Sequence, residues 1–304
     1  MYNIELGKSK MSVPTIAVGC MRIADMSENE LARFIDTSLS LGANFFDHAD
    51  IYGGGKCEEV FGKAIKTLDR EDIIIQTKCG IVPGKMFDFS YEHIINSVDK
   101  SLQRLGTEYI DVLLLHRPDA LVEPEEVSHA FEQLKMSGKV RHFGVSNQNP
   151  YQMELLKKYL EVPIVANQLQ FGIMHTPMIQ SGINVNMYNT SAVDRDGGAL
   201  NYCRLNDITI QPWSPMQYGF FEGVFVDNDK FPVLNKVLDD LAKKYSVSKT
   251  TICIAWILRH PAKMQPVTGT TNINRLVDSI KATEIELTRE EWYAIYKAAG
   301  NILP

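Results

Sequence analysis

Residues 73–116 read IIIQTKCGIVPGKMFDFSYEHIINSVDKSLQRLGTEYIDVLLLH, and this stretch contains the repeating unit of the chain. It begins with the run Ile73–Lys78 and ends with the run Ile110–His116, and both have the composition of buried parallel strands. Between them, Ser90–Leu105 has the apolar spacing of a helix, and Gly106 follows as a terminator. A strand, a helix and another strand in this order predict a βαβ unit.

The same alternation continues in both directions along the chain. Helical spacing recurs in Ser27–Leu41, where Ser27 and Glu30 have the pattern of a capping box, and in Glu125–Ser137. Further runs of buried-strand type are Thr15–Gly19, Ala43–Asp47, Val140–Val145, Ile164–Gln168, Ile208–Pro212 and Met264–Val267. Eight strands alternating with helices predict an α/β fold, a (β/α)8 TIM barrel. No G-x-G-x-x-G follows the first strand, which argues against a doubly wound sheet.

Three segments lie outside this repeat. Tyr2–Glu5 and Lys10–Val13 flank Leu6–Ser9 and predict an N-terminal β-hairpin, and Arg289–Ala299 predicts an extra C-terminal helix. The segment Phe171–Asn201 is long, polar and rich in Gly and Asn, and we expect it to shape a pocket or to pack beside one. No Gly/Ser-rich or Pro-rich linker interrupts the chain, so we expect residues 1–304 to form a single domain.

Composition argues against several classes of partner. The 31 Lys and Arg residues against 37 Asp and Glu residues leave a net charge of −6 without a basic cluster, which disfavours nucleic acid. The longest apolar run, Ile252–Leu258, is far shorter than the roughly 20 residues of a membrane span, and no apolar stretch near the N-terminus predicts a secretory signal. The five scattered cysteines predict neither a disulfide framework nor a metal site, and they favour a cytoplasmic location.

Four polar residues stand at or just after the ends of consecutive predicted strands: Asp47, Tyr52, Lys78 and His116. Catalytic groups of a barrel gather at the carboxyl ends of its strands, so we expect these four to meet. The charge of Lys78 would lower the pKa of Tyr52, Asp47 would fix Lys78, and His116 would bond a substrate oxygen. Together they predict a general acid facing a polarised carbonyl, with no metal. Each residue taken singly also suits a turn, a packing or a surface role.

Later strand ends carry a second set of small polar and aromatic residues. Ser146 and Asn147 end the fifth strand, Gln168 ends the sixth, and Trp213 and Ser214 follow the seventh. Such residues could bond the amide of a planar ring and stack on its face. The same residue types are also common in ordinary turns, so both interpretations stay open.

A third motif, Gly269-Thr270-Thr271-Asn272-Ile273-Asn274-Arg275, opens the eighth predicted helix. Free backbone N–H groups and hydroxyls at a helix start predict an anion site, and Arg275 could meet a second phosphate. Capping of the helix by Thr270 or Asn272 is the alternative, and the two roles are compatible.

The order and spacing of these motifs resemble the aldo-keto reductase family over nearly the whole chain. The motifs that carry the resemblance are Asp47-His48-Ala49-Asp50-Ile51-Tyr52-Gly53, Thr77-Lys78, Leu115-His116, Gly144-Val145-Ser146-Asn147 and Trp213-Ser214-Pro215. The resemblance implies a (β/α)8 barrel that binds an extended NADPH-type cofactor across its C-terminal face. It also implies that Asp47, Tyr52, Lys78 and His116 form the catalytic tetrad.

The resemblance further implies a set of cofactor contacts. Ser146, Asn147 and Gln168 would bind the carboxamide, and Trp213 would stack on the nicotinamide. Those for the pyrophosphate and the adenosine phosphate are Ser214, Pro215, Met216, Gly269, Thr270, Thr271, Arg275, Asp278 and Ser279. We also expect contacts from Gly19 and Met21. Many members have Lys in place of Gly269 and Glu-Asn in place of Asp278-Ser279, but Arg275 keeps NADPH favoured over the alternative, NADH.

These inferences together predict an NADPH-dependent reductase of a small aldehyde or ketone, with Tyr52 as general acid. Arg117 follows His116 where many members carry an aromatic residue, so we expect a pocket unlike that of the aldose-reductase type. The candidates for lining it are Met21, Arg22, Phe87, Phe89, Tyr218 and Phe220. The alternatives are a cofactor-binding auxiliary subunit with slow or no turnover, and an isomerase or lyase using Lys78 as a Schiff base. The substrate and the oligomeric state stay open, and a monomer agrees with the sequence.

Overall fold

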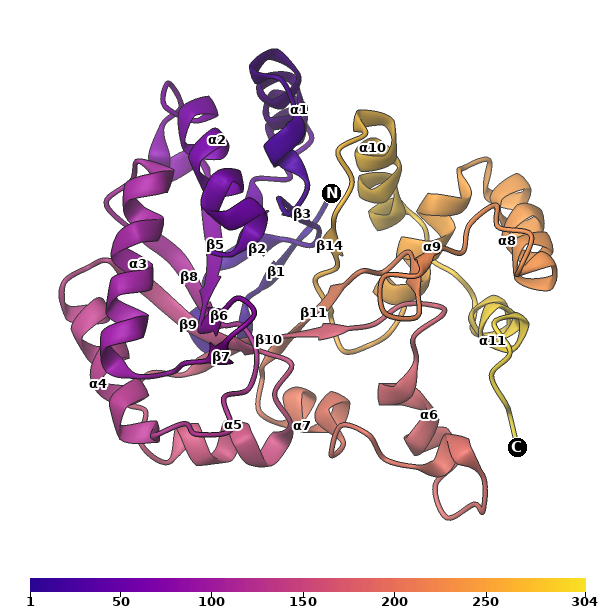
Figure 1. The fold of residues 1–304 in the computed structure, drawn as a ribbon. Helices are drawn as coiled ribbons and strands as arrows, with labels where there is room; N and C mark the ends of the chain where they lie inside the picture. The colour runs from indigo at the N-terminus through magenta and orange to yellow at the C-terminus, as the bar shows by residue number, and fades with distance from the viewer.

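A computed structural model describes residues 1–304, and its centre is an eight-stranded parallel sheet (Figure 1). In spatial order the strands are β11 (Thr209–Trp213), β10 (Ile164–Gln170), β9 (Val140–Ser146), β8 (Ile110–Leu115), β5 (Ile74–Cys79), β4 (Phe45–Asp47), β3 (Ala17–Gly19) and β14 (Val267–Thr268). The Gln265 N–H donates to the Ile210 carbonyl at 3.0 Å, which joins the segment before β14 to β11. The two edges of the sheet therefore meet in a nearly closed barrel, and the predicted (β/α)8 TIM barrel is confirmed.

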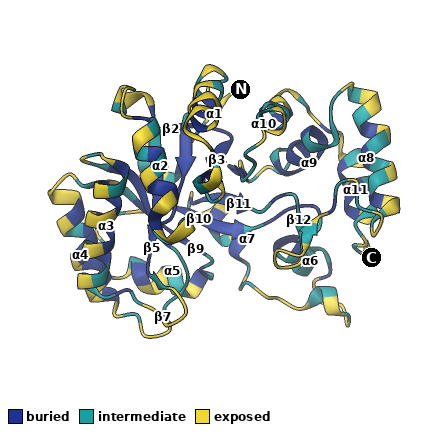
Figure 2. Cartoon of the chain, turned by 45° about the horizontal axis from the view of Figure 1, so that its top comes forward, coloured by how far each residue is buried: buried dark blue, intermediate teal, exposed yellow.

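Helices surround the barrel, with their buried faces turned inward and their exposed faces outward (Figure 2). In chain order they are α1 (Glu28–Ser40), α2 (Lys56–Ala64), α3 (Tyr91–Leu105), α4 (Pro124–Met136), α5 (Pro150–Lys157), α6 (Pro177–Ile183), α7 (Ala199–Leu205), α8 (Pro232–Tyr245), α9 (Lys249–Leu258), α10 (Ile273–Lys281) and α11 (Arg289–Ala298). The last of these confirms the predicted C-terminal helix. Buried apolar side chains of strands and helices form one large core between the two layers.

The helix ends follow the chemistry of their first and last residues. At α1 the Glu30 N–H donates to Ser27 Oγ at 3.3 Å, while the Ser27 N–H donates to the Glu30 carboxylate at 2.9 Å, which confirms the capping box. At α3, Gly106 ends the helix with a φ of 64°, a left-handed conformation that glycine adopts without steric cost. Helix α4 begins at Pro124, one residue before its predicted start, because the first helical position needs no backbone N–H.

A hairpin of β1 (Asn3–Glu5) and β2 (Ser12–Pro14) closes the amino-terminal end of the barrel. Its second strand starts at Ser12 and not at Lys10 as predicted, because Lys10 has a φ of 62° and ends a short 3-10 turn. The Gly7 N–H donates to Thr209 Oγ1 at 2.8 Å, and a Cβ at Gly7 would lie 2.2 Å from the Val165 carbonyl oxygen. This tight plug leaves the carboxyl end as the open end of the barrel.

Several strand ends differ from their prediction, and two of the differences bear on the barrel and the site. Strand β14 spans only Val267–Thr268, whereas Met264–Val267 was expected. Pro266 has no N–H to donate to a neighbouring strand, and the buried side chain of Gln265 turns into the barrel. Strand β8 stops at Leu115, so His116 lies one residue beyond it, on the loop at the open end.

The segment Phe171–Asn201 holds α6, a 3-10 turn at Thr190–Ala192 and the start of α7, and it extends from the body at the lower right of Figure 1. It contacts the C-terminal tail, where Thr176 Oγ1 donates to Asn301 Oδ1 at 2.9 Å. Two short hairpins, β6 (Ile81–Val82) with β7 (Met86–Phe87) and β12 (Gln217–Tyr218) with β13 (Gly223–Val224), extend from the open end.

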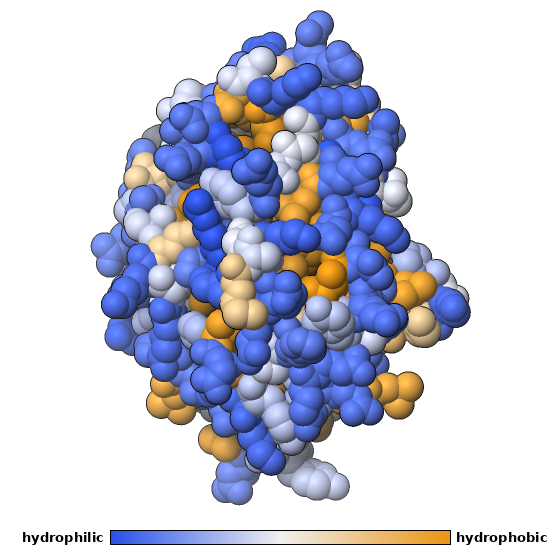
Figure 3. Space-filling model, turned by 90° about the vertical axis from the view of Figure 1, so that its left-hand side faces the viewer, coloured by the Kyte–Doolittle hydropathy of each residue, from blue (hydrophilic) through white to orange (hydrophobic).

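The outer face shown in Figure 3 is mostly hydrophilic, with apolar side chains scattered among charged ones. None of the helices combines the length and the apolar character needed to cross a bilayer.

Candidate active site

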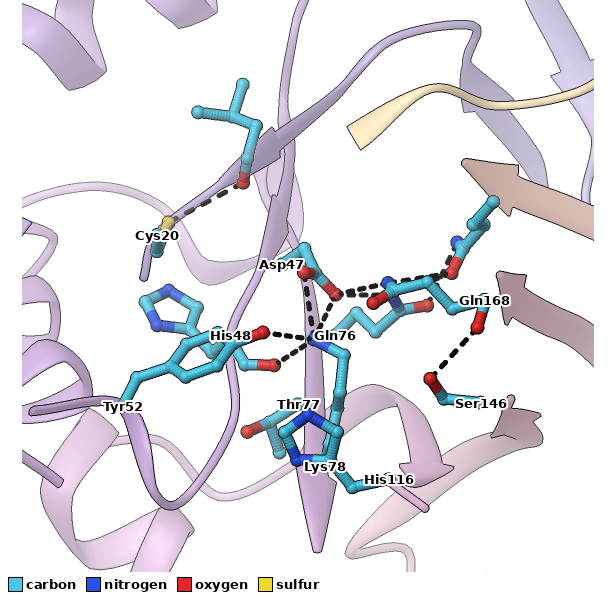
Figure 4. A network of polar contacts seen from close by, with 12 residues as sticks. Cys20, Asp47, His48, Tyr52, Gln76, Thr77, Lys78, His116, Ser146 and Gln168 are labelled. Carbon is cyan, nitrogen blue, oxygen red and sulfur yellow. Dashed lines mark hydrogen bonds and ion pairs between the residues drawn. The ribbon is translucent and has the colours of Figure 1, made fainter. Parts of the chain in front are cut away.

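The structure brings together the four residues expected to act as a tetrad (Figure 4). Asp47 ends β4, Lys78 lies near the end of β5, His116 follows β8, and Tyr52 starts a 3-10 turn after β4. Lys78 Nζ lies 2.8 Å from both carboxylate oxygens of Asp47 and 3.3 Å from Tyr52 Oη. The rings of Tyr52 and His116 meet edge to face with their centroids 5.9 Å apart. Strand-end placement therefore predicts this cluster correctly.

The carboxylate of Asp47 accepts hydrogen bonds from three side chains of the site. Its Oδ1 accepts from Gln76 Nε2 at 2.6 Å, from Lys78 Nζ at 2.8 Å and from Gln168 Nε2 at 3.0 Å. The residue is only 2% exposed. A buried carboxylate needs such donors, and together they fix the direction in which it holds Lys78.

A row of buried amides leads from Asp47 through the barrel to the N-terminal hairpin. Gln76 Nε2 donates to Gln211 Oε1 at 2.9 Å, and Gln211 Nε2 returns a bond to Gln76 Oε1 at 3.0 Å. Gln211 Nε2 also donates to Gln265 Oε1 at 2.9 Å, and Gln265 Nε2 donates to the Pro14 carbonyl at 2.7 Å. This glutamine row (Gln76, Gln211 and Gln265) gives the barrel a polar interior beneath the site.

Lys78 is fully buried, and its third hydrogen bond runs to the His48 carbonyl at 2.7 Å. Burial by itself lowers the pKa of Lys78. Asp47 and Tyr52 together raise it by more than burial lowers it, so the net pKa lies above the usual 10.5. The side chain is therefore an ammonium at neutral pH. A Schiff-base nucleophile needs a neutral amine, so this environment disfavours the isomerase or lyase alternative.

Tyr52 differs from expectation in its acidity. Burial raises the pKa of Tyr52 above its usual 10.0, and the ammonium of Lys78 offsets this only in part. The expectation of a lowered pKa is wrong, because the cost of desolvating a phenolate exceeds the attraction of one cation. The phenol stays protonated at neutral pH, and the ammonium lies at 3.3 Å, where it would stabilise a phenolate formed by proton transfer.

His116 is a neutral imidazole in this environment. Burial, followed by the charges of Lys78 and Arg117, lowers the pKa of His116 well below 6.5. A neutral ring has one N–H to donate and one nitrogen that accepts. Its Nδ1 is buried without any hydrogen-bond partner in the protein. The fold therefore does not use this nitrogen, and a ligand could bond to it.

One cavity of about 750 Å³ spans the open end from this cluster to the start of α10. Asp47, Tyr52 and His116 line it, while Lys78 lies behind them. The expected cofactor contacts that also line it are Gly19, Met21, Ser146, Asn147, Gln168, Trp213, Ser214, Pro215, Met216, Gly269, Thr270, Thr271, Arg275 and Ser279. Asp278 is the exception, because it lies outside the lining and its carbonyl accepts from Thr251 Oγ1 at 2.8 Å.

The polar set expected around a planar ring forms one connected group in the middle of the cavity. Asn147 Nδ2 donates to Ser146 Oγ at 2.7 Å, and Trp213 Nε1 donates to Asn147 Oδ1 at 3.2 Å. Asn147 and Ser214 have φ values of 59° and 51°, in the left-handed region that favours glycine. Strain of about 1–3 kcal/mol per residue is typical of backbone held for a functional site, which favours the binding interpretation over ordinary turns.

The far end of the cavity has the character of an anion site. Asn272 caps α10 by accepting from the Arg275 N–H at 3.1 Å, which leaves Thr270 free of that role. N–H groups of the first helical turn stay without backbone partners there. A Cβ at Gly269 would lie 2.9 Å from Arg22 Nη1, which donates to the Gly269 carbonyl at 3.1 Å. Neither Arg22 nor Arg275 has a carboxylate at ion-pair distance.

Some lining residues were expected and others were missed. Met21 and Arg22 line the cavity as expected, but Phe89 is only 1% exposed and packs in the core against Gly80. Phe87, Tyr218 and Phe220 do not line the cavity; Phe221 does, and it stacks on Trp213 at a centroid distance of 6.0 Å. The segment 171–201 contributes no lining residue and packs beside the site, since a Cβ at Gly172 would lie 2.4 Å from the Pro215 carbonyl oxygen.

A second buried ionic group lies behind Lys78 and was also missed. Glu58 of α2 is fully buried, accepts from Thr77 Oγ1 at 2.6 Å, and pairs with Arg104 of α3 at 2.7 Å. Beside it, burial and then the charge of Glu58 raise the pKa of Asp50 to about 7. This group joins two helices to the residue that precedes Lys78.

Comparison with known proteins agrees with this geometry. The model of the aldo/keto reductase family matches residues 15–299. The chain belongs to this family. It is therefore an NAD(P)H-dependent oxidoreductase, and its reaction is of the carbonyl-reducing kind. No three His, Cys, Asp or Glu side chains of the reductase gather so as to hold a metal ion.

The reductase resembles several proteins along almost its full length. It is 36% identical to the uncharacterized oxidoreductase YcsN of Bacillus subtilis, over 90% of this chain and 89% of the relative. It is 32% identical to a 6-dehydroglucose reductase of Agrobacterium fabrum, over 95% of both chains. The crystal structure of the thermostable aldo-keto reductase Tm1743 in complex with the inhibitor epalrestat has a TM-score of 0.79 and 27% identity, over 98% of this chain and 100% of that chain.

Proposed function

We propose that this reductase uses NADPH to reduce an aldehyde or a ketone to an alcohol, with Tyr52 as the proton donor. The observation that carries the proposal is the position of Lys78 Nζ, 2.8 Å from Asp47 and 3.3 Å from Tyr52 Oη, at one end of the cavity. A protonated phenol beside a fixed ammonium can act as a general acid, because the ammonium offsets part of the cost of forming the phenolate.

The residues along the cavity fit a nicotinamide cofactor. Ser146, Asn147 and Gln168 present hydroxyl and amide groups that match the donors and acceptors of a carboxamide. At the other end, the unpaired guanidinium groups of Arg22 and Arg275 lie beside free helix N–H groups, which suits phosphate. Two such cations support NADPH over NADH, because only NADPH carries a 2′-phosphate. When bound, this cofactor supplies the hydride that reduces the carbonyl carbon.

The chain's own side chains supply the proton and orient the substrate. Tyr52 Oη donates its proton to the carbonyl oxygen, and Lys78 stabilises the phenolate that remains. Asp47 keeps Lys78 directed at Tyr52 through the bonds to both of its oxygens. His116, as a neutral imidazole, donates an N–H to the same carbonyl oxygen and holds it within reach of Tyr52. Trp213 also lines the cavity, and its apolar ring helps to exclude water from the reacting groups.

The experiment compares wild type with Tyr52→Phe in NADPH oxidation, using a panel of aldehydes, ketones and quinones. Loss of the general acid should lower kcat by about a hundredfold to ten-thousandfold. Binding of NADPH, measured by quenching of tryptophan fluorescence, should change little because the phenol oxygen is not part of the proposed cofactor contacts. Tyr151→Phe is the matched control, since this tyrosine is 83% exposed on α5. Unchanged turnover in Tyr52→Phe would refute the assignment.

The same experiment addresses the auxiliary-subunit alternative, which no feature of the structure favours. An auxiliary subunit would bind NADPH but reduce no member of the panel, in wild type and Tyr52→Phe alike.

A further inference from the structure

Arg117 places a cation next to the proposed reaction centre. It follows His116 directly on the loop after β8, and it lines the same cavity as Tyr52 and His116. Its guanidinium carbon lies 5.6 Å from the centroid of the Trp213 ring. The side chain is partly buried, and it belongs to the end of the cavity opposite Arg275. Arg117 therefore faces the substrate and not the phosphates of a cofactor.

The guanidinium of Arg117 lies over the Trp213 ring but has no polar partner in the protein. It forms no ion pair and no hydrogen bond, although it has five N–H donors. Two carboxylates from the same region of the chain already have other partners. Asp47 is bonded to Lys78, while Asp119 accepts from the N–H groups of Phe89 and Leu121 at 2.9 and 2.8 Å. A charged group that loses water without gaining a partner is unfavourable, so this arrangement favours a ligand that supplies the missing acceptors.

The positive charge of Arg117 has no counter-charge among the other residues of the reaction centre. Asp47 and Lys78 cancel each other as an ion pair, and His116 is neutral. Arg117 therefore gives this end of the cavity a net positive charge. A planar guanidinium matches the two oxygens of a carboxylate better than it matches a single hydroxyl.

We propose that Arg117 binds a carboxylate of the substrate, so that the substrates of this reductase are oxo acids, molecules with both a carbonyl and a carboxylate group. The inference rests on the proposed function, because it assumes that the carbonyl group lies at Tyr52 and His116. Arg117 and His116 are neighbours on one loop, so the two ends of a small oxo acid can reach both at once. The carboxylate binds and orients, and the proton and hydride transfers stay as described above.

The test uses pairs of substrates in which a carboxylate is replaced by a neutral ester. Succinic semialdehyde and 4-carboxybenzaldehyde are each compared with their methyl esters, which keep the aldehyde but lose the carboxylate. In wild type, kcat/KM for the acids should exceed that for the esters by about tenfold to a hundredfold, as expected for one charge-assisted contact. In Arg117→Met this ratio should fall to near one, mainly through the KM of the acids, and Arg117→Lys should restore part of it. Lys66→Met removes an exposed charge on the outer surface and should leave the ratio as in wild type.

A binding measurement separates this inference from the proposed function. The holoenzyme is titrated with 4-(hydroxymethyl)benzoate and with its methyl ester, and Kd is measured by tryptophan fluorescence. Tighter binding of the acid in wild type, lost in Arg117→Met, supports the carboxylate site even if no aldehyde is turned over. Equal Kd values for acid and ester in wild type overturn the inference, whereas loss of turnover in Tyr52→Phe would still support the reductase mechanism.

Discussion

Removing Arg104 should destabilise this protein far more than its position on a surface helix suggests. Glu58 is fully buried, and Arg104 neutralises it: Arg104 Nε donates to Glu58 Oε2 at 2.8 Å, and Arg104 Nη2 lies 2.7 Å from the same oxygen as an ion pair. In Arg104→Met the carboxylate keeps only the Thr77 hydroxyl at 2.6 Å. Loss of this hydrogen bond and ion pair leaves an uncompensated buried carboxylate, which costs roughly 3–5 kcal/mol when one partner of a buried pair is removed. We expect a loss of about 3–5 kcal/mol in the free energy of unfolding.

Urea denaturation followed by circular dichroism measures this loss, and a second ion pair supplies the control. Lys236 and Asp240 also lie 2.7 Å apart, but their side chains are 71% and 56% exposed. Lys236→Met should therefore cost less than about 0.5 kcal/mol, because water and salt screen an exposed pair. The comparison separates the effect of burial from that of distance.

A double variant tests the physical reason. In Glu58→Met with Arg104→Met no buried carboxylate is left without a cation, so the double variant should be more stable than Arg104→Met alone. The reasoning is refuted if Arg104→Met costs less than about 1 kcal/mol, or if the second substitution adds its own full cost.

Three other outcomes follow from features described above. Arg275→Met should raise the KM for NADPH about tenfold or more and leave the KM for NADH nearly constant. An equal rise for both cofactors would refute the assignment of Arg275 to the 2′-phosphate. Burial raises the pKa of Asp50 from 3.8 to about 7, so the native state holds the carboxyl proton more tightly than the unfolded chain does. The stability that protonation of Asp50 contributes is therefore fully present below about pH 4 and is lost as the pH rises to 7. Asp50→Asn should thus gain thermal stability relative to wild type between pH 5 and pH 8, and a constant difference in Tm would contradict this. Gly144→Ala should destabilise by about 1–3 kcal/mol, since its Cβ would lie 2.6 Å from Leu114 Cδ2 and 2.7 Å from the Ala166 carbonyl oxygen, whereas Gly182→Ala meets nothing within 4 Å and should be neutral or stabilising in the same unfolding assay.

The sequence predicts the barrel and the residues at its strand ends because both follow from local pattern. Asp47, Lys78 and His116 each stand where an apolar run stops, and parallel strands bring such positions to one edge. The sequence does not reveal which long-range bonds these residues make. Gln76 and Gln211 lie inside apolar strands. A polar residue at such a position indicates that it has a hydrogen-bond partner in the core, but the sequence does not identify that partner.

Burial is the second quantity that local pattern does not supply. Glu58 lies in the first turn of an amphipathic helix, where a carboxylate is normally solvated, and only the packing of α2 on α3 buries it. The acidity of Tyr52 shows the same limit, because the position of Lys78 was expected whereas the extent of desolvation was not.

The glutamine row provides a way to measure how often the barrel opens. Both ends of the row are acceptors, the Asp47 carboxylate and the Pro14 carbonyl, so no amide can turn over without losing a bond. Gln76, Gln211 and Gln265 are fully buried, so deuterium can replace their side-chain NH₂ protons only when the strands separate. The exchange times of these three amide groups, followed by nuclear magnetic resonance, would thus report the lifetime of the closed barrel, independently of fraying in the surrounding helices.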